Sequence, residues 1–313
     1  MEAKKSLKAV AACALSVAML FAGAACGTSD GSDDAASSDS GSKASELTGY
    51  DVSSVQKDDD IAKLLPDYVT KDGKLTIGMD TSYAPAEFLA EDGKTPVGFD
   101  VDIAKALAQV FGLEADPQTS NFDSIIPSIG SKYDIGVSSF TITPERMKAV
   151  DFVSMFKAGS TWVVKKGNPG KIDTSDLCGL KIAVQTGTVQ EEEANTIAKG
   201  CEADNKAEVM SYKRQAEAAT AVATGKADAF YADSPVAGYA ISQTDGQLEA
   251  LGDVEGVAKQ GIAVKKGNTQ LAEAVQKAVQ KLMDDGTYMK ILKHWGVENG
   301  AIDKAEINPT DLG

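Results

Sequence analysis

Three residues of the sequence stand where a folded chain could bind a small charged molecule. Arg146 follows Thr143-Pro144-Glu145, a pattern typical of a helix start, and a guanidinium can hold a carboxylate through two parallel hydrogen bonds. Thr188 begins a second expected helix, where a hydroxyl and free backbone N–H groups attract anions. Asp233 ends an expected strand, and α/β sheets usually bind ligands at the ends of their strands.

Each of these residues also has a simpler interpretation. Arg146 could be a surface arginine in the charged stretch Glu145–Lys148, and Thr188 could be an ordinary helix cap. Asp233 could cap a helix that starts at Ser234-Pro235, which on sequence alone is a serious alternative. At Thr188 the capping and binding roles can coexist.

The composition excludes several other chemistries. The chain has 313 residues with 46 acidic and 31 basic side chains, and its net charge of -15 argues against binding to a phosphate backbone. One histidine cannot form a multi-histidine metal site, and four scattered cysteines are too few for an iron–sulfur or zinc-ribbon framework. We therefore expect no nucleic-acid partner and no metal or other cofactor.

Residues 1–25 have the features of a secretory signal peptide. The lysine-rich start, Lys4 to Lys8, precedes an apolar run from Ala9 to Ala25 that is shorter and weaker than a membrane span. Cys26 follows small residues and resembles a bacterial lipoprotein site, at which the cysteine is lipidated and becomes the new N-terminus. The alternative is a signal peptide that is cut elsewhere, with Cys26 incidental.

We expect residues 26–72 to form a lipid anchor and a disordered tether. Residues 27–45 contain only Gly, Thr, Ser, Asp, Ala and Lys, so they have no large apolar side chains to offset the entropy lost on ordering. Export also places the two remaining cysteines, Cys178 and Cys201, in an oxidising compartment, and we predict a disulfide between them. The alternative is two free, buried thiols.

Beyond the tether the sequence alternates between strand and helix patterns, which predicts α/β layers with parallel strands. The expected strands are residues 74–80, 133–139, 162–164, 181–184 and 227–232. Helices are expected to begin near Asp100, Thr143 and Thr188, over residues 215–224, and twice between Leu271 and Trp295.

A short internal repeat indicates how these elements are organised. Residues 164–168 and 264–268 are both Val-Lys-Lys-Gly-Asn, and each copy extends a short apolar strand. Two similar exits from strand to loop would explain so short a match. Because the copies lie 100 residues apart, they also suggest that the chain crosses twice between two comparable α/β lobes, as in a hinged clamp.

From about Gly73 to the C-terminus, an ordered set of motifs resembles one family. The motifs are Tyr83-Ala-Pro, Val97-Gly-Phe-Asp, Phe122-Asp-Ser-Ile-Ile-Pro, Ser138-Ser-Phe-Thr-Ile-Thr-Pro-Glu-Arg, Gln185-Thr-Gly-Thr and Ala227-Asp-Ala-Phe-Tyr-Ala-Asp. The family is the amino-acid-binding proteins of ABC importers, extracellular solute-binding family 3, and the leader resembles that of its actinobacterial lipoprotein members. The resemblance implies a two-lobed periplasmic-binding-protein-like fold of type II, with residues 73–160 and 261–313 as lobe I and residues 161–260 as lobe II.

The resemblance also implies how a free amino acid would be held. Arg146 and Thr188 would bind its α-carboxylate, and Asp233 would accept from its α-ammonium group. Ser139 and Thr141 would contact polar ligand atoms, although both could simply satisfy a turn. Members of the family often carry a second hydroxyl after the residue that matches Thr188, where this chain has Val189.

Specificity is expected to come from four other positions. Tyr83 and Phe122 match places where family members sandwich the ligand side chain, though both, and Phe122 in particular, could instead serve core packing. Asp80 and Gln185 could contact a polar side-chain tip, and a carboxylate at Asp80 favours basic or amide ligands. No single amino acid is selected.

The resemblance thus implies a monomeric receptor, not an enzyme, that delivers its ligand to an ABC permease. It would be tethered to the outer face of the membrane through lipidated Cys26. The alternative is a periplasmic enzyme on the same fold, such as a cyclohexadienyl or prephenate dehydratase. An enzyme would need an acid or base in the cleft, for which Glu87 is the nearest candidate besides Asp80 and Asp233.

Overall fold

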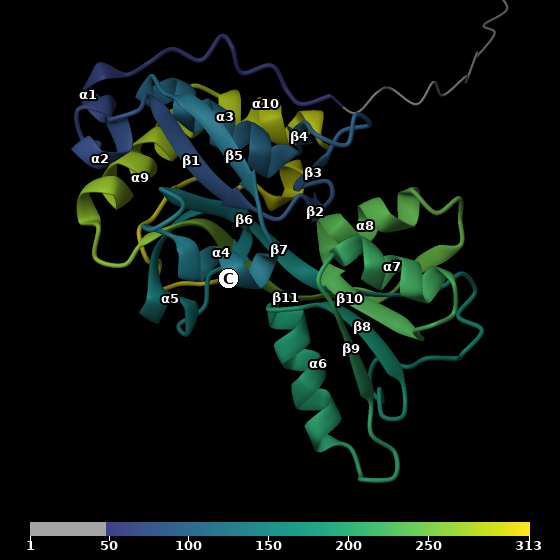
Figure 1. Cartoon of the computed structure of the whole chain (residues 1–313). Coiled ribbons are helices and arrows are strands. Elements are labelled where there is room, and N and C mark those ends of the chain that lie inside the picture. The colour runs from purple at the N-terminus through teal and green to yellow at the C-terminus, as the bar shows by residue number, and fades with distance from the viewer. Residues whose placement is uncertain (1–47) are drawn as a thin grey trace, which may run out of the picture. The chain divides into compact units, whose positions relative to one another are not determined.

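The computed structural model describes residues 48–313 (Figure 1). The expected signal peptide, the expected lipidation site at Cys26 and residues 26–47 of the expected tether lie outside these residues. Across residues 48–313, every helix is too short or too polar to span a membrane.

An eight-stranded mixed sheet runs through the described residues in the order β5-β1-β6-β11-β7-β10-β8-β9. Its strands are β1 (Lys74–Met79), β5 (Glu114–Thr119), β6 (Ile135–Thr141), β7 (Val150–Lys165), β8 (Lys181–Gln185), β9 (Glu208–Tyr212), β10 (Ala229–Asp233) and β11 (Leu248–Lys265). A small second sheet consists of β2 (Ser82–Tyr83), β3 (Glu87–Leu89) and β4 (Pro96–Val97).

Helices lie beside the strands at both ends of this sheet (Figure 1). They are α1 (Asp59–Ala62), α2 (Asp67–Thr70), α3 (Phe99–Phe111), α4 (Phe122–Ser128), α5 (Arg146–Ala149), α6 (Val189–Gly200), α7 (Gln215–Ala223), α8 (Ser234–Ser242), α9 (Thr269–Asp284) and α10 (Thr287–His294), followed by the 3-10 turn η1 (Glu298–Gly300).

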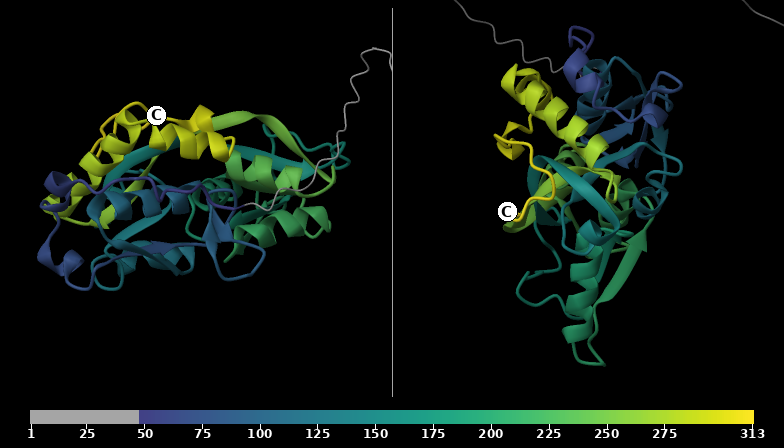
Figure 2. Two further views of the ribbon diagram at one scale, coloured as in Figure 1. Left: turned by 90° about the horizontal axis from the view of Figure 1, so that it is seen from above. Right: turned by 90° about the vertical axis from the view of Figure 1, so that its left-hand side faces the viewer.

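The two ends of the sheet are parallel, which confirms the prediction of parallel strands. β1 pairs in parallel with β5 and β6, and β8 pairs in parallel with β9 and β10. Between them, in the middle of the sheet, β7 and β11 form a long antiparallel ribbon, with β6 paired to β11 and β10 paired to β7; Figure 2 gives two further views of the fold. We call the elements on the β1 side of this ribbon lobe I and those on the β8 side lobe II.

The ribbon explains the internal repeat. At one end of the ribbon Leu248 pairs with Lys165, and at the other end Lys265 pairs with Val150. The two Val-Lys-Lys-Gly-Asn copies therefore follow the ends of the two crossing strands, in opposite lobes. The two expected crossings between the lobes are β7 and β11.

The alternating apolar residues of β1 lie in the hydrophobic core, as the sequence predicts. Leu75, Ile77 and Met79, at alternate positions of β1, are all fully buried. The same core takes in the apolar face of α3 and of α9, which contact each other (Figure 1). Lobe II has a second cluster in which Trp162 stacks on Tyr231 with ring centroids 4.0 Å apart.

Residues 48–72 belong to this folded body, although the sequence placed them in the tether. They contain α1 and α2, and they bury five apolar side chains in the core of lobe I: Val52, Val55, Ile61, Leu65 and Val69. Ile61, Leu65 and Val69 are spaced four positions apart, but α1 and α2 are only four residues long and Pro66 lies between them, so the sequence did not indicate a continuous helix here.

Asp100 does not cap its helix as the sequence suggests. The residue before α3 is Gly98, whose φ of 132° and whose approach to Ala86 leave no room for a side chain, because a Cβ would lie 2.1 Å from the Ala86 oxygen. Asp100 lies in the first turn of α3 and is fully buried. Its carboxylate turns away from the helix end to the backbone of Ser139.

Cys178 and Cys201 form a disulfide, as predicted. They are 23 positions apart, and the bond ties the segment before β8 to the end of α6. Cys201 is buried against lobe II's apolar cluster.

Replacing both cysteines by serine is expected to lower the free energy of unfolding by roughly 3 kcal/mol, because a loop of this length loses its closure constraint in the unfolded chain. Guanidinium chloride denaturation measures the change. A reductant should shift the wild-type midpoint in the same direction and leave the Cys178→Ser/Cys201→Ser midpoint unchanged. Equal midpoints for the oxidised wild type and the double variant would contradict the prediction.

Candidate ligand-binding site

Seven of the nine expected ligand residues line one cavity between the lobes. They are Tyr83, Phe122, Ser139, Thr141, Arg146, Thr188 and Asp233. Val189 and Gln190 also line the cavity, and the sequence did not identify either as a ligand contact. The cavity is small, about 10 Å³, because side chains from both lobes close over it. A cation from lobe I and an anion from lobe II thus face the same space.

Arg146 is held in place by backbone carbonyl groups from both lobes. It begins α5, where its N–H donates to Thr143 Oγ1 at 3.1 Å, as the helix-start pattern predicts. Its guanidinium donates to the Thr141 oxygen at 2.8 Å and to the Gly187 oxygen at 3.0 Å, and it lies 5.4 Å from the Phe122 ring centroid. Burial lowers the pKa of Arg146, but a guanidinium stays charged.

Asp233 ends β10, as expected, and two glutamines fix its carboxylate. Gln190 Nε2 donates to Oδ1 at 2.7 Å, and Gln260 Nε2 donates to Oδ2 at 2.7 Å. Asp233 is buried, and its own side chain does not cap α8. Burial raises its pKa, while the hydrogen bonds from Tyr83 and the two glutamines and the charge of Arg146 act against that rise.

Neither glutamine was identified from the sequence. Gln190 lies two positions beyond Thr188 and also donates to Ser160 Oγ at 2.8 Å, so its place on α6 next to an expected site residue could have suggested it. Gln260 lies inside β11, where nothing in the local sequence distinguishes it. Both are buried, and together they leave the Asp233 carboxylate rigid with free acceptor capacity.

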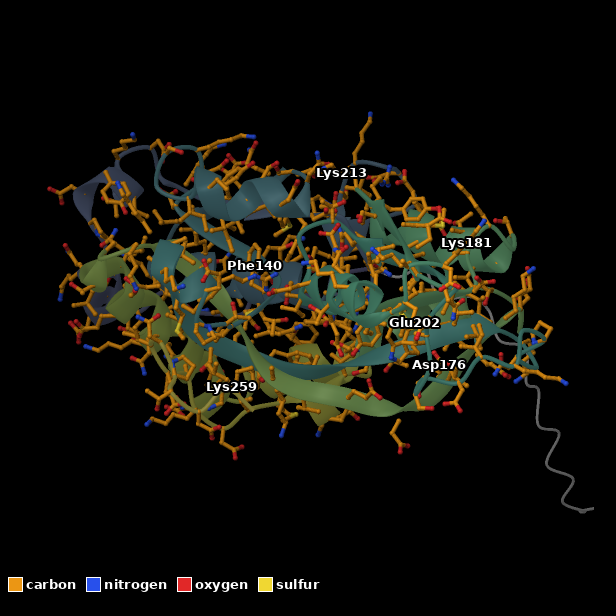
Figure 3. The ribbon with its side chains drawn as sticks, turned by 90° about the horizontal axis from the view of Figure 1, so that it is seen from below. Phe140, Asp176, Lys181, Glu202, Lys213 and Lys259 are labelled. Carbon is orange, nitrogen blue, oxygen red and sulfur yellow. A yellow bond between two sulfur atoms is a disulfide. The ribbon has the colours of Figure 1, made fainter. Side chains whose placement is uncertain are left out.

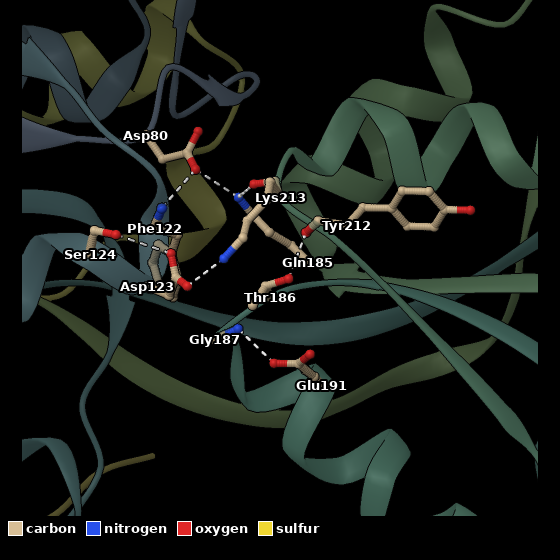
Figure 4. A network of polar contacts seen from close by, with 10 residues as sticks. All are labelled: Asp80, Phe122, Asp123, Ser124, Gln185, Thr186, Gly187, Glu191, Tyr212 and Lys213. Atoms are coloured by element: carbon tan, nitrogen blue, oxygen red, sulfur yellow. Dashed lines mark hydrogen bonds and ion pairs between the residues drawn. The ribbon is translucent and has the colours of Figure 1, made fainter.

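Thr188 caps α6, so its simpler interpretation is realised. Its Oγ1 accepts from the Glu191 N–H at 3.1 Å and donates to the Gln185 oxygen at 2.7 Å. The neighbouring Gly187 N–H donates to Glu191 Oε2 at 2.7 Å (Figure 4). The same residue lines the cavity, so the capping role does not remove it from the site.

Asp80 and Gln185 do not line the cavity but join the lobes beside it (Figure 4). Gln185 Nε2 donates to Asp80 Oδ2 at 2.9 Å, and the Phe122 N–H donates to the same oxygen at 3.0 Å. Asp80 Oδ1 accepts from both the N–H and the hydroxyl of Ser82. Burial raises the pKa of Asp80, and these hydrogen bonds oppose the rise.

An ion pair forms a further contact between the lobes. Lys213 Nζ, after β9, lies 2.6 Å from Asp123 Oδ2 at the start of α4 (Figure 4). Both side chains are partly exposed, and Figure 3 shows Lys213 at the edge of the molecule, away from interior residues such as Phe140. The bonds of Gln185 and Arg146, and the bond from the Asp233 N–H to the Tyr83 hydroxyl at 3.4 Å, are further direct polar links between the lobes.

A larger groove of about 610 Å³ is lined by α8, by residues of β11 and by the segment around Trp295. It includes neither Arg146 nor Asp233, and its described walls carry no Lys, Arg, Asp or Glu side chain. We place the ligand site in the small cavity because the opposite charges converge there.

A model of one family, described as bacterial extracellular solute-binding proteins, family 3, matches residues 75–298. The chain belongs to this family. Among members of family 3, the arginine-binding protein ArgT of Corynebacterium glutamicum is 35% identical over 257 residues, which cover 81% of this chain and 84% of ArgT. The L-cystine-binding protein TcyJ of Escherichia coli is 32% identical over 230 residues, covering 72% of this chain and 84% of TcyJ.

Solved structures show the same two-lobed type II fold. An ancestral arginine-binding protein bound to arginine has a TM-score of 0.66 and 37% identity, covering 71% of this chain and 98% of its own. An ancestral amino acid-binding protein, AncCDT-1, described as a precursor of cyclohexadienyl dehydratase, has a TM-score of 0.67 and 36% identity, covering 74% and 99%. These family 3 matches confirm the fold class that the sequence predicts.

Reversing the charge of Lys213 is expected to separate the lobes of this family 3 protein. In Lys213→Glu a carboxylate faces Asp123, so repulsion replaces attraction, and small-angle X-ray scattering should give a larger radius of gyration. Adding Asp123→Lys should restore the wild-type value. The control is Lys181→Glu, an exposed residue at the far end of β8 with the same change in net charge (Figure 3). Identical radii for the two glutamate variants would rule out the link.

Proposed function

We propose that this protein is an extracellular receptor that binds a free amino acid by closure of its two lobes and delivers it to an ABC permease. The observation that carries the proposal is the convergence of Arg146 and Asp233, from opposite lobes, on one cavity. A free amino acid carries a carboxylate and an ammonium group, and this pair of side chains complements both. A neutral sugar carries neither of these charges.

In this proposal the ligand's α-carboxylate binds Arg146 and Thr188, and its α-ammonium donates to Asp233. Ser139 and Thr141 contact its polar atoms, and Tyr83 and Phe122 enclose its side chain. A cavity of about 10 Å³ does not hold an amino acid, so entry requires the lobes to move apart about the β7–β11 ribbon. A charge-assisted hydrogen bond contributes about 1.5–3 kcal/mol. A micromolar affinity corresponds to about 8 kcal/mol, so a few such bonds are sufficient.

The proposed ligands are polar or basic amino acids. Relatives are named for arginine, cystine, glutamine and histidine, and a solved ancestral relative was bound to glutamine. Asp80 and Gln185, next to the cavity, are the proposed partners of a polar side-chain tip. The carboxylate of Asp80 supports a basic or amide ligand.

The proposal keeps the predicted organisation of the chain. Residues 1–25 are removed on export, Cys26 is lipidated, and the monomeric receptor stays tethered to the outer face of the membrane. Lobe I takes residues 73–160 and 261–313 together with residues 48–72, which pack on its core instead of forming part of the tether, and lobe II takes residues 161–260. A fixed position beside the membrane would present the closed receptor to its permease.

The position of Glu87 favours a receptor over a dehydratase. Glu87 is fully buried and does not line the cavity, so it cannot reach a bound ligand as an acid or base. The relatives ArgT and TcyJ are named as binding proteins, and AncCDT-1 is itself described as an amino acid-binding protein.

A thermal-shift panel of the common amino acids tests the proposal. A bound amino acid at 100 times its dissociation constant adds about 2.7 kcal/mol to the stability of the folded state and should raise the melting temperature. Polar or basic members should give the largest shifts. A panel in which no amino acid changes the melting temperature would refute the receptor function.

Arg146→Ala is expected to weaken binding of the best amino acid by about 100-fold or more, because a buried ligand carboxylate would lose its cationic partner. Isothermal titration calorimetry measures the affinity, and circular dichroism checks the fold. The matched control is Arg214→Ala, which removes the chain's other arginine from an exposed position before α7 and should leave the affinity nearly unchanged. Equal affinities for Arg146→Ala and the wild type would disprove the assigned site.

A further inference from the structure

Two buried carboxyl groups lie directly behind the ligand cavity. Glu87 on β3 and Asp100 on α3 are both 0% exposed, and neither contacts a Lys or Arg side chain in residues 48–313. The fold brings them together, because they bond to the consecutive residues Ser138 and Ser139, and the Asp100 N–H donates at 3.0 Å to the oxygen of Ala86, the residue before Glu87. One oxygen of each, Glu87 Oε2 and Asp100 Oδ1, has no other partner among the described residues. Two charged carboxylates would repel each other strongly in such a site.

We infer that Glu87 and Asp100 share one proton, with Glu87 donating to Asp100, and that this pair positions the Ser138–Ser139 corner of the binding cavity. The remaining oxygens of the pair are already bonded to this corner. Ser138 Oγ donates to Glu87 Oε1 at 2.6 Å, and the Ser139 N–H and Oγ donate to Asp100 Oδ2 at 2.6 and 3.1 Å. A proton between the two acids satisfies both unpartnered oxygens at once.

The hydrogen bonds indicate which residue carries the proton. Asp100 accepts two hydrogen bonds from Ser139, whereas Glu87 accepts one from Ser138, so the negative charge is better stabilised on Asp100. Burial raises the pKa of Asp100 to about 7 and raises that of Glu87 well above its usual value. Both shifts agree with a neutral Glu87 beside a charged Asp100.

The pair controls the cavity through the backbone of Ser139. This residue lines the cavity with a φ of 45°, in the left-handed region that residues other than glycine rarely adopt. Its two hydrogen bonds to Asp100 hold it there. On the other side, Ser138 Oγ accepts from the Asp80 N–H at 3.0 Å, and Asp80 bonds to Gln185 of lobe II. The pair therefore connects a cavity residue with a link between the lobes.

The surrounding charges make loss of the proton unfavourable. Asp80 faces Glu87, and Asp233 faces Asp100, so both add negative charge, while Tyr83 near Glu87 stays neutral because burial raises its pKa. The positive charge of Arg146 acts on Asp233, whose pKa it lowers. Because the folded state binds this proton more tightly than the unfolded state, stability conferred by the shared proton is present at low pH and declines as pH rises through the raised pKa values.

Infrared spectroscopy of Glu87→Gln tests the inference directly. Glutamine keeps a donor for Asp100 and an acceptor for Ser138 but has no titrating proton. At neutral pH the wild type should show the carbonyl band of a neutral carboxylic acid, and Glu87→Gln should lose it. The control, Glu91→Gln, makes the same change at an exposed position near β3 and should keep the band. A spectrum of Glu87→Gln identical to that of the wild type would overturn the shared proton.

Two pH profiles test the coupling to the cavity, and the second rests on the proposed function. As the pH rises from about 4, the ordinary range of a carboxyl group, through neutrality, the unfolding free energy of the wild type should fall more steeply than that of Glu87→Gln. The affinity of the wild type for its best amino acid should fall over the same range, and that of Glu87→Gln should stay nearly constant. Parallel affinity profiles would overturn the positioning role. A lack of amino-acid binding would instead refute the proposed function, while the infrared band and the stability profile would still decide the shared proton.

Discussion

The antiparallel pairing of β7 with β11 is the constraint on which the rest of the structure depends. Both strands pass through both lobes, so every contact in the cavity depends on how this ribbon bends. The pairing is regular at its ends and shifts register three times between Leu251 and Gly261, which marks the middle of the ribbon as the natural bending point. Gly159 lies opposite this stretch, where a Cβ would come within 2.5 Å of the Glu255 oxygen, so the close approach of the strands there requires glycine.

The same ribbon also fixes the charges of the site. Asp233 pairs with Ser160 of β7 at the end of β10, and its carboxylate is held by Gln260 of β11 and by Gln190, which in turn bonds Ser160. Asp233, the proposed acceptor for the ligand's ammonium group, is thus attached to both crossing strands. Arg146 comes from the opposite lobe and bonds the Gly187 oxygen of lobe II when the cavity is closed. Lobe closure and the approach of the two charges are consequently one motion.

The sequence predicts the elements better than the partners of their polar side chains. Strand β1 and the start of α6 follow from alternation and from a helix cap, because both depend on neighbouring residues. The role of Gln260 could not be predicted from neighbouring residues, because it bonds a carboxylate 27 positions away, across strands that come together only in the folded sheet. Asp100 shows the same limit. Its position suits a helix cap, but the glycine before it allows the chain to turn so tightly that the carboxylate faces β6 instead.

Asp80 shows how a family motif can place a residue near a site and still leave its role open. Each of its oxygens already accepts two hydrogen bonds, and one of these comes from Gln185 in the opposite lobe. A basic ligand side chain that reached Asp80 would have to replace or share the Gln185 bond, so its gain would be the difference between two bonds to the same charge. A neutral side chain would leave that bond intact. A basic ligand is therefore preferred only if its bond to Asp80 stabilises the complex more than loss of the Gln185 bond between the lobes destabilises it. Ligand specificity and lobe closure thus depend on the same hydrogen bonds.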